Sequence, residues 1–374
     1  MKLRVEKVEE EKGKYYLISE KSPFYPDYKG GQLGDRGKID EANVISVIEK
    51  NGMIYHEVDK PLGTGEYEVV LDENHRNFIR QHHSAQHILS AAFENVADIS
   101  TVSFRMGLEY STIDLDVPFI KDEVISEVEL EANKVIQSCL KVEEIIVQKD
   151  DLDNFSLRKK LSEKVSGKVR IIKIGDYDYS ACGGYHVKNT GEIGLVKILK
   201  TEKVKGNLTR VYFVSGLKAI EYFQKYTNVL RNLSNLLTSS IFELDDRVEQ
   251  LLEKVKEQNS KLEDISENLA KEKIKELKVL SDDIFFIEAD ELVSKFLPKY
   301  FKEPNSMLIV YDGTKYNFLS TGKYNIKEIV EKIKSKISGK GGGGKDKGTF
   351  IPEREINIKE IKEIMEVLGW KDGL

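Results

Sequence analysis

Residues 169–204 read VRIIKIGDYDYSACGGYHVKNTGEIGLVKILKTEKV. The first part, 169–179, alternates and is rich in β-branched and aromatic residues, which is typical of a strand. A second segment of the same kind follows at 192–204. Between them lies ACGG, whose glycines let the backbone turn and approach a ligand without obstruction by a Cβ atom. We therefore expect two strands joined by a glycine turn, which is a rigid support for a site.

The turn carries Cys182 and, four positions later, His186, in a chain with only two cysteines and six histidines. Alone, this pair is equally compatible with a buried thiol beside a surface imidazole. Partners for it occur in 78–97, FIRQHHSAQHILSAAFENVA, which has the pattern of a buried amphipathic helix. His83 and His87 lie one helical turn apart and would point the same way. Three imidazoles and a thiolate form a tetrahedral ligand set that Zn²⁺ accepts, so the four residues predict a zinc site.

The chain has 374 residues, more than one hydrophobic core usually serves, so we expect several domains. The pattern favours an α+β protein, with helices predicted at 81–97, 121–138 and 153–166. The predicted divisions are a small β-rich domain at 1–73, a mixed domain carrying the zinc site at 74–216, a helical segment at 217–281 and an α/β domain at 282–374.

The helical segment contains a heptad pattern. The positions are 241, 244, 248, 251, 255, 258, 262, 265 and 269, and all except Gln258 are apolar. Such a seam predicts a coiled coil or a long helical hairpin, and the alternative is a surface helix on a globular body. Because an apolar seam needs a partner surface, we expect a homodimer formed through residues 241–374.

Charge and composition bound the class of protein. The formal net charge is −6, but 158–173, 197–210 and 323–347 are locally basic, which permits contact with phosphates. The charged start and the lack of a long apolar run predict a soluble, cytoplasmic protein without a signal peptide. Two cysteines make no disulfide framework, and Cys139 is predicted to be a core residue.

The last domain contains KISGKGGGGKDKGTF at 336–350. The four consecutive glycines are compatible with a plain flexible linker. A lysine-flanked glycine loop also exposes backbone N–H groups to phosphates, although the spacing is not that of a Walker motif.

These motifs resemble those of a known family. HSAQHIL at 83–89 and IGDYDYSACGGYHVKNTGEIGLVKI at 174–198 are similar to the two zinc motifs of the editing domain of alanyl-tRNA synthetase and of the free-standing AlaX proteins. SPFYPDYKGGQLGDRGKI at 22–39 resembles the family's glycine-rich segment, whose glutamine corresponds to Gln32. The chain departs from the family where Tyr28 and Lys29 replace a glycine and where Tyr185 replaces a common threonine.

The resemblance extends over nearly the full length, because the glycine segment is similar to one in the C-terminal domain of alanyl-tRNA synthetase and of the long AlaX proteins. It implies a hydrolase that deacylates mischarged tRNA(Ala), carrying serine or glycine, at a zinc site formed by His83, His87, Cys182 and His186. Gln32 is the implied polar group of the pocket. Lys340, Lys345 and Lys347 are the implied tRNA contacts.

Three alternatives are compatible with the same residues. One is a tRNA-binding module in which zinc is purely structural, and the second is an unrelated zinc hydrolase of small substrates. The third is an editor of the threonyl type, since the editing domain of threonyl-tRNA synthetase shares the zinc pattern.

Overall fold

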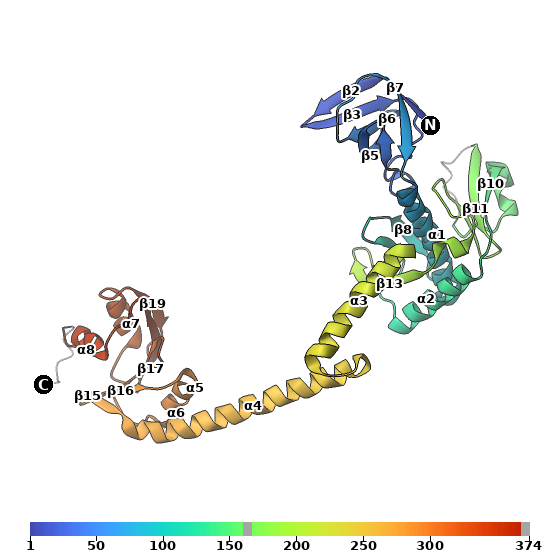
Figure 1. Cartoon of the computed structure of the whole chain (residues 1–374). Helices are drawn as coiled ribbons and strands as arrows, with labels where there is room; N and C mark the ends of the chain where they lie inside the picture. Colours follow the sequence, from blue (N-terminus) through green and yellow to red (C-terminus); the bar gives the residue numbers. More distant parts are fainter. Residues whose placement is uncertain (160–166, 368–374) are drawn as a thin grey trace. The chain divides into compact units, whose positions relative to one another are not determined.

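The computed structural model describes residues 1–159 and 167–367. Packing divides the chain into two compact units, Met1–Arg231 and Asn232–Leu374, each mixed in helix and strand (Figure 1). The expected mixture of helices and strands is confirmed, whereas the finer division into four domains stays a prediction. Within the described residues, no helix is both long and apolar enough to cross a membrane.

The first unit begins with an antiparallel sheet in the order β1-β7-β4-β5-β6-β3-β2 (Figure 1). Alternate residues of these strands face a core of Leu, Val, Ile and Phe side chains, as a strand buried on one face requires. This sheet confirms the small β-rich beginning that the sequence predicts. The strands are β1 (Lys2–Val5), β2 (Lys7–Glu11), β3 (Lys14–Ser19), β4 (Gly37–Ile39), β5 (Ala42–Lys50), β6 (Met53–Val58) and β7 (Gly65–Leu71).

Helix α1 (Glu73–Ala97) follows the sheet directly. The side chain of Asp72 caps its first turn by accepting from the backbone N–H of His75, and Asp98 ends it in the left-handed conformation with φ 55°. The middle of α1 is buried along its whole circumference, including both histidines of the predicted site. The helix is therefore a central support of the first unit.

Two further sheets and helix α2 (Asp122–Gln137) pack around α1. One sheet has the order β13-β14-β9-β8 and the other β10-β11-β12, and they share a single hydrophobic core with both helices. The strands are β8 (Thr101–Arg105), β9 (Ser111–Leu115), β10 (Val142–Gln148), β11 (Lys168–Ile174), β12 (Asp178–Ala181), β13 (Val196–Val204) and β14 (Leu208–Ser215).

Three local predictions differ from the structure. The predicted strand at 192–204 begins only at Val196, after the 3₁₀ turn η3 (Thr190–Ile193). Residues 155–159 of the helix predicted at 153–166 are not helical, and 160–166 lie outside the described residues. Cys139 is exposed, because α2 ends before it and Cys139 turns the chain with φ 53°, away from the apolar face of the helix.

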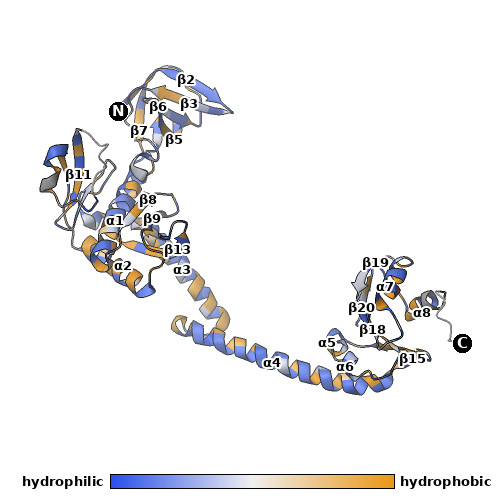
Figure 2. Cartoon of the chain, turned by 180° about the vertical axis from the view of Figure 1, so that it is seen from behind, coloured by the Kyte–Doolittle hydropathy of each residue, from blue (hydrophilic) through white to orange (hydrophobic). Residues whose placement is uncertain are grey.

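Two long helices follow, α3 (Gly216–Leu237) and α4 (Leu244–Lys273). The heptad seam lies on α4, except for Ile241, which precedes the helix. Along α4 apolar residues recur between charged ones (Figure 2). Among the described residues most of the seam is only partly covered, since Val255, Leu262 and Ile265 are 51, 49 and 63% exposed. The helix is thus present as predicted, and its pairing in a coiled coil remains a prediction.

The rest of the second unit is a sheet in the order β15-β16-β17-β18-β20-β19. Helix α7 packs on β19 and β20, and α5 and α6 pack on α4. The elements are β15 (Lys278–Ser281), β16 (Ile284–Glu288), α5 (Glu291–Ser294), α6 (Leu297–Tyr300), β17 (Met307–Tyr311), β18 (Tyr316–Ser320), α7 (Ile326–Lys334), β19 (Gly339–Gly343), β20 (Lys347–Pro352) and α8 (Ile358–Val367).

Candidate metal centre

The four predicted ligands converge in the first unit. One ligand atom each from His83, His87, Cys182 and His186 lies within 4.8 Å of all the others. The Sγ atom of Cys182 is 3.4 Å from Nε2 of His83 and 3.3 Å from Nε2 of His186. Bond lengths of about 2.0–2.3 Å to a tetrahedral zinc ion place ligand atoms roughly 3.3–3.7 Å apart. The donor set suits one zinc ion, and both distances from Sγ of Cys182 lie within this range.

Each imidazole is held from behind through its Nδ1 atom. Nδ1 of His83 donates to Oε1 of Gln32 at 2.8 Å, and Nδ1 of His87 donates to Asp178 at 3.1 Å. Nδ1 of His186 lies 3.1 Å from Oγ of Ser84. Such partners fix the tautomer that binds a metal through Nε2. Burial lowers the pKa of His87, but Asp178 and Cys182 outweigh burial and raise the pKa to about 9, so this imidazole loses a proton when it binds a metal.

Asp178 is itself firmly placed on β12. Its carboxylate accepts from Nε of Arg158 at 2.7 Å and from the hydroxyl of Ser180, and its side chain is fully buried. Burial raises the pKa of Asp178, but His87 and Arg158 outweigh this and hold the pKa below its usual value. The group behind His87 is thus an ionised carboxylate, the stronger type of acceptor.

The thiol of Cys182 is strongly acidic. Burial raises its pKa, but hydrogen bonds with His186, His83 and His87 outweigh burial and lower the pKa to about 2. Cys182 is therefore a thiolate at neutral pH, which is the form that binds metals. Burial lowers the pKa of His83, and it lowers the pKa of His186 to about 3, so both imidazoles are neutral.

Gln32 lies behind His83. It is fully buried, and its Oε1 also accepts from the backbone N–H of Tyr185 at 2.9 Å. Its Nε2 has no partner among the described residues. Gln32 is not among the residues that line the cavity beside the cluster, and its hydrogen bonds join His83 to the glycine turn.

Tyr185 points away from the cluster. Its ring packs 5.2 Å from that of Tyr25 and lies under the guanidinium of Arg76, and its hydroxyl donates to Asp35. Tyr185 thus ties the glycine turn to the segment between β3 and β4 and to α1.

A cavity of about 370 Å³ opens beside the cluster. His83, His87 and Cys182 form part of its wall, together with Gly30 from the loop before Gln32. The lining also includes β8 and a segment that contains Arg158 and Lys159. The cluster is therefore accessible to a small ligand, although His83 and His87 are buried.

The three lysines of the last domain that are predicted to contact tRNA are exposed. Lys340 lies on β19, Lys345 in the following turn and Lys347 at the start of β20, and all three are exposed. The glycine segment is mostly a strand and not the expected loop, because Gly341–Gly343 pair with β20. A Cβ atom on Gly341 would lie 2.3 Å from the carbonyl oxygen of Thr349, so the close pairing requires glycine there.

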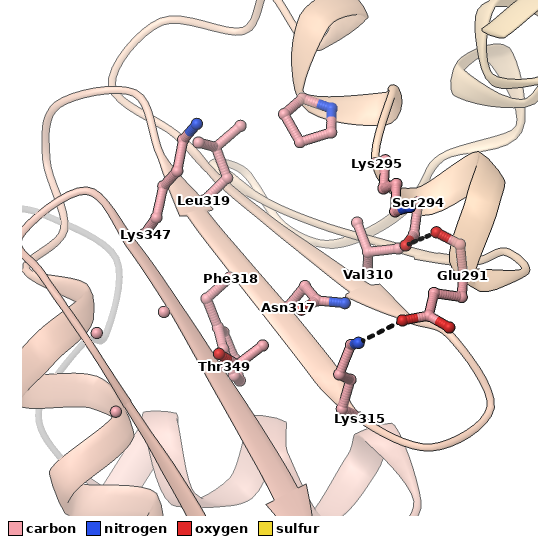
Figure 3. Close-up of a pocket in the computed structure, with 14 residues that line it drawn as sticks. Glu291, Ser294, Lys295, Val310, Lys315, Asn317, Phe318, Leu319, Lys347 and Thr349 are labelled. Carbon is pink, nitrogen blue, oxygen red and sulfur yellow. Dashed lines mark hydrogen bonds and ion pairs between the residues drawn. The ribbon is translucent and has the colours of Figure 1, made fainter. Parts of the chain in front are cut away.

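A cavity of about 420 Å³ lies between this sheet and α5–α6. Lys315 pairs with Glu291 at one side of it, while Lys347 lies apart from this pair (Figure 3).

In the first unit many cations of the predicted basic segments are already paired. Those with acidic partners include Arg158, Arg170, Lys197, Lys200 and Arg210.

The sequence-based search missed the supporting residues Asp178 and Ser84. Ser84 is adjacent to His83 on α1, and its hydroxyl also accepts from the backbone of Val187 at 3.1 Å. Asp178 precedes Cys182 by four residues, one of several acidic residues in that segment. No local signal separates it from its neighbours, since its partner His87 is 91 residues away in the chain.

The fold and the cluster define a mixed α/β protein with a partly buried His₃Cys group. Residues 169–212 match the family model described as the threonyl and alanyl tRNA synthetase second additional domain. Alanyl-tRNA editing protein AlaX-L of Pyrococcus horikoshii is 30% identical over 361 residues, covering 90% of this chain and 87% of that protein. The chain therefore belongs to the family of alanyl-tRNA editing proteins.

Other relatives share less of their length. Alanyl-tRNA editing protein Aarsd1-B of Xenopus laevis is 34% identical over 229 residues, which is 61% of this chain and 56% of that protein. Alanine–tRNA ligase of Rickettsia bellii is 28% identical over 365 residues. That match covers 88% of this chain but only 41% of the ligase.

Proposed function

We propose that this chain is a free-standing editing hydrolase that removes a wrong amino acid from tRNA(Ala), with serine as the main target and glycine as a second. The observation that carries the proposal is the His₃Cys cluster, in which each imidazole has a fixed Nδ1 partner beside a cavity. Membership of the editing family supports it.

The need for such an enzyme follows from binding energies. A pocket shaped for a small apolar side chain rejects an added hydroxyl only about a hundredfold. Serine is therefore attached to tRNA(Ala) at a rate that requires a second, hydrolytic selection. The reaction splits the ester between the amino acid and the ribose: water supplies hydroxide to the carbonyl carbon and a proton to the ribose oxygen.

In this proposal His83, His87, Cys182 and His186 hold zinc, and Gln32, Ser84 and Asp178 keep the imidazoles in place. When bound, zinc would polarise the ester carbonyl or anchor the aminoacyl end of the RNA. We assign Gln32 a positioning role, because its side chain is buried behind His83. The cavity of about 370 Å³ is where the aminoacyl group would lie.

The deciding experiment is deacylation of charged tRNA. Hydrolysis of seryl-tRNA(Ala) supports the proposal. Hydrolysis of seryl-tRNA(Thr) alone would identify a threonyl-type editor, and tRNA binding without hydrolysis would identify a binding module with a structural metal.

We further propose that Lys340, Lys345 and Lys347 hold the tRNA. Replacing all three with alanine should weaken tRNA binding. It should also reduce the slope of log affinity against log salt concentration by about 2–3, since each lysine on a phosphate contributes about 0.7–0.9 to that slope. The substrate concentration needed for half-maximal deacylation should rise, while turnover at saturation changes little. Titrations of tRNA binding at several salt concentrations measure the first two effects.

The control makes the same change of net charge elsewhere in the second unit. Lys278, Lys302 and Lys359 are exposed and lie outside the basic segment 323–347, and their replacement by alanine should leave the slope nearer to that of the wild type. Normal tRNA binding with lost turnover in the first variant would contradict the proposed role of Lys340, Lys345 and Lys347 in holding the tRNA.

We also propose a homodimer through the second unit. Val255→Glu with Leu262→Glu adds two charges to the exposed seam of α4 and should convert a dimer into a monomer, because an apolar seam tolerates charges poorly. Asn259→Glu with Ser260→Glu adds the same charge beside the seam and should leave the dimer intact. Sedimentation at micromolar concentration measures both, and a wild-type monomer would defeat the proposal.

A further inference from the structure

A second cavity in the first unit, of about 740 Å³, lies between the first sheet and the strands β8, β9 and β14. Its lining includes Tyr28, Arg36, Arg105, Tyr110, Thr112 and Tyr212. It is larger than the cavity beside the metal centre, and the proposed reaction assigns it no ligand.

The two cavities share one wall. Gly30 and Phe104 line the cavity of the metal centre, whereas Tyr28 and Arg105 line the larger one. Successive residues of a strand face opposite sides, so β8 presents Phe104 to His83, at 5.3 Å between ring centres, and Arg105 to the other cavity. The backbone N–H of Met106 donates to the carbonyl of Gly31 at 3.0 Å, which joins the loop to β8. An extended ligand that passes over this shared wall would occupy both cavities.

Aromatic rings are available in the larger cavity. Tyr28 is 68% exposed and Tyr110 is 43% exposed, and the ring of Tyr110 meets that of Tyr212 edge-on at 5.1 Å. Exposed aromatic rings with free faces are the usual platforms for nucleic-acid bases.

The backbone conformation of Tyr28 is strained. Its φ of 65° lies in the left-handed region, which disfavours residues with a Cβ atom, and its exposed ring gains little packing in return. The neighbouring Asp27 fixes the loop by accepting from the backbone of Gly34 and Val47 and from the guanidinium of Arg36. A strained residue on a firmly held loop points to a function for its side chain.

The charge of the cavity is suited to a phosphate. Asp27 is paired with Arg36 at 3.0 Å, and Glu109 is paired with Lys218 at 3.4 Å, so both lining carboxylates are compensated. Arg105 is exposed and has no acidic partner among the described residues, which leaves one cation for a ligand.

From these features we infer that the larger cavity binds the unpaired nucleotides that precede the aminoacylated 3′ end of the RNA. Tyr28 and Tyr110 stack on bases, and Arg105 contacts a phosphate. The inference rests on the proposed function, because the metal centre must hold the ester for the preceding nucleotides to cross the shared wall. Loss of one stacking ring typically costs about tenfold in affinity.

Binding of uncharged RNA hairpins tests the inference without any hydrolysis. One hairpin carries a four-nucleotide single-stranded 3′ end and the other is blunt. We expect the wild-type chain to prefer the first, and Tyr28→Ala with Tyr110→Ala to lose about tenfold or more of that preference. Tyr226→Ala removes a ring of similar exposure, 46%, from α3 and should change nothing. Equal binding of both hairpins by the wild type would overturn the inference.

Kinetics provide the second readout. The double variant should need more seryl-tRNA(Ala) for half-maximal rate, yet hydrolyse the seryl ester of adenosine, which lacks the preceding nucleotides, at the wild-type rate. An equal loss on both substrates would overturn the inference, because the rings would then support the metal centre. Failure of the proposed function appears differently, as a wild-type chain that prefers the single-stranded end but hydrolyses neither ester.

Discussion

Replacing Cys182 with alanine is expected to remove most of the bound zinc and, with it, the deacylase activity. The thiolate is within 3.4 Å of two of the imidazoles and is the only anionic donor of the set. Loss of a residue that merely supports a ligand costs about 10–100-fold in metal affinity, so loss of a ligand should cost at least that much. Elemental analysis of the purified protein measures the metal directly.

Cys139→Ala is the matched control. This thiol is exposed at the end of α2 and contributes to no metal-ligand group among the described residues. The control should retain one zinc per chain and near-normal activity. A Cys182→Ala protein with a full zinc ion, or a wild-type protein that takes up no transition metal, would contradict the assignment of the ligands.

Adding a single methyl group at Gly184 should be nearly as damaging. A Cβ atom there would lie 2.2 Å from Cε1 of His83 and 2.4 Å from Oε1 of Gln32. Both atoms are buried, so His83 must move and lose its hydrogen bond with Gln32. We expect Gly184→Ala to lower zinc affinity and deacylation by about 10–100-fold, as for loss of a supporting contact.

Gly183→Ala is the matched control for Gly184→Ala. A Cβ atom on Gly183 meets no other atom within 4 Å, although the residue is adjacent in the same turn. Zinc titration against a competing chelator should show near-normal affinity for this variant and a weakened one for Gly184→Ala. Equal affinities would mean that the turn is looser than its contacts indicate.

The convergence of the four cluster residues could be predicted because each pair has a local signature. His83 and His87 are one turn apart on a helix, and Cys182 and His186 flank a glycine turn. The supporting residues had no such signature, since Gln32 and Asp178 meet their histidines across 51 and 91 residues of chain. Long-range pairing of this kind depends on the tertiary fold.

The glycine segment shows a second limit of sequence patterns. Consecutive glycines normally indicate a flexible loop, yet here Gly341 and Gly343 are needed where β19 approaches β20 closely. Cys139 shows a third, because apolar neighbours in α2 predicted burial while the end of the helix turned the residue outward. Pairing across the sheet decided the first conformation and the end of a helix the second, and local composition predicted neither.

Deacylation of tRNA(Ala) charged with serine, glycine or alanine, followed side by side with the full-length zinc-loaded protein, tests the proposed function most directly. We expect seryl-tRNA(Ala) to be hydrolysed far faster than it decays alone, glycyl-tRNA(Ala) to be hydrolysed as well, and alanyl-tRNA(Ala) to be spared. Seryl-tRNA(Ala) that is as stable with the protein as without it would contradict an editing role for the metal centre.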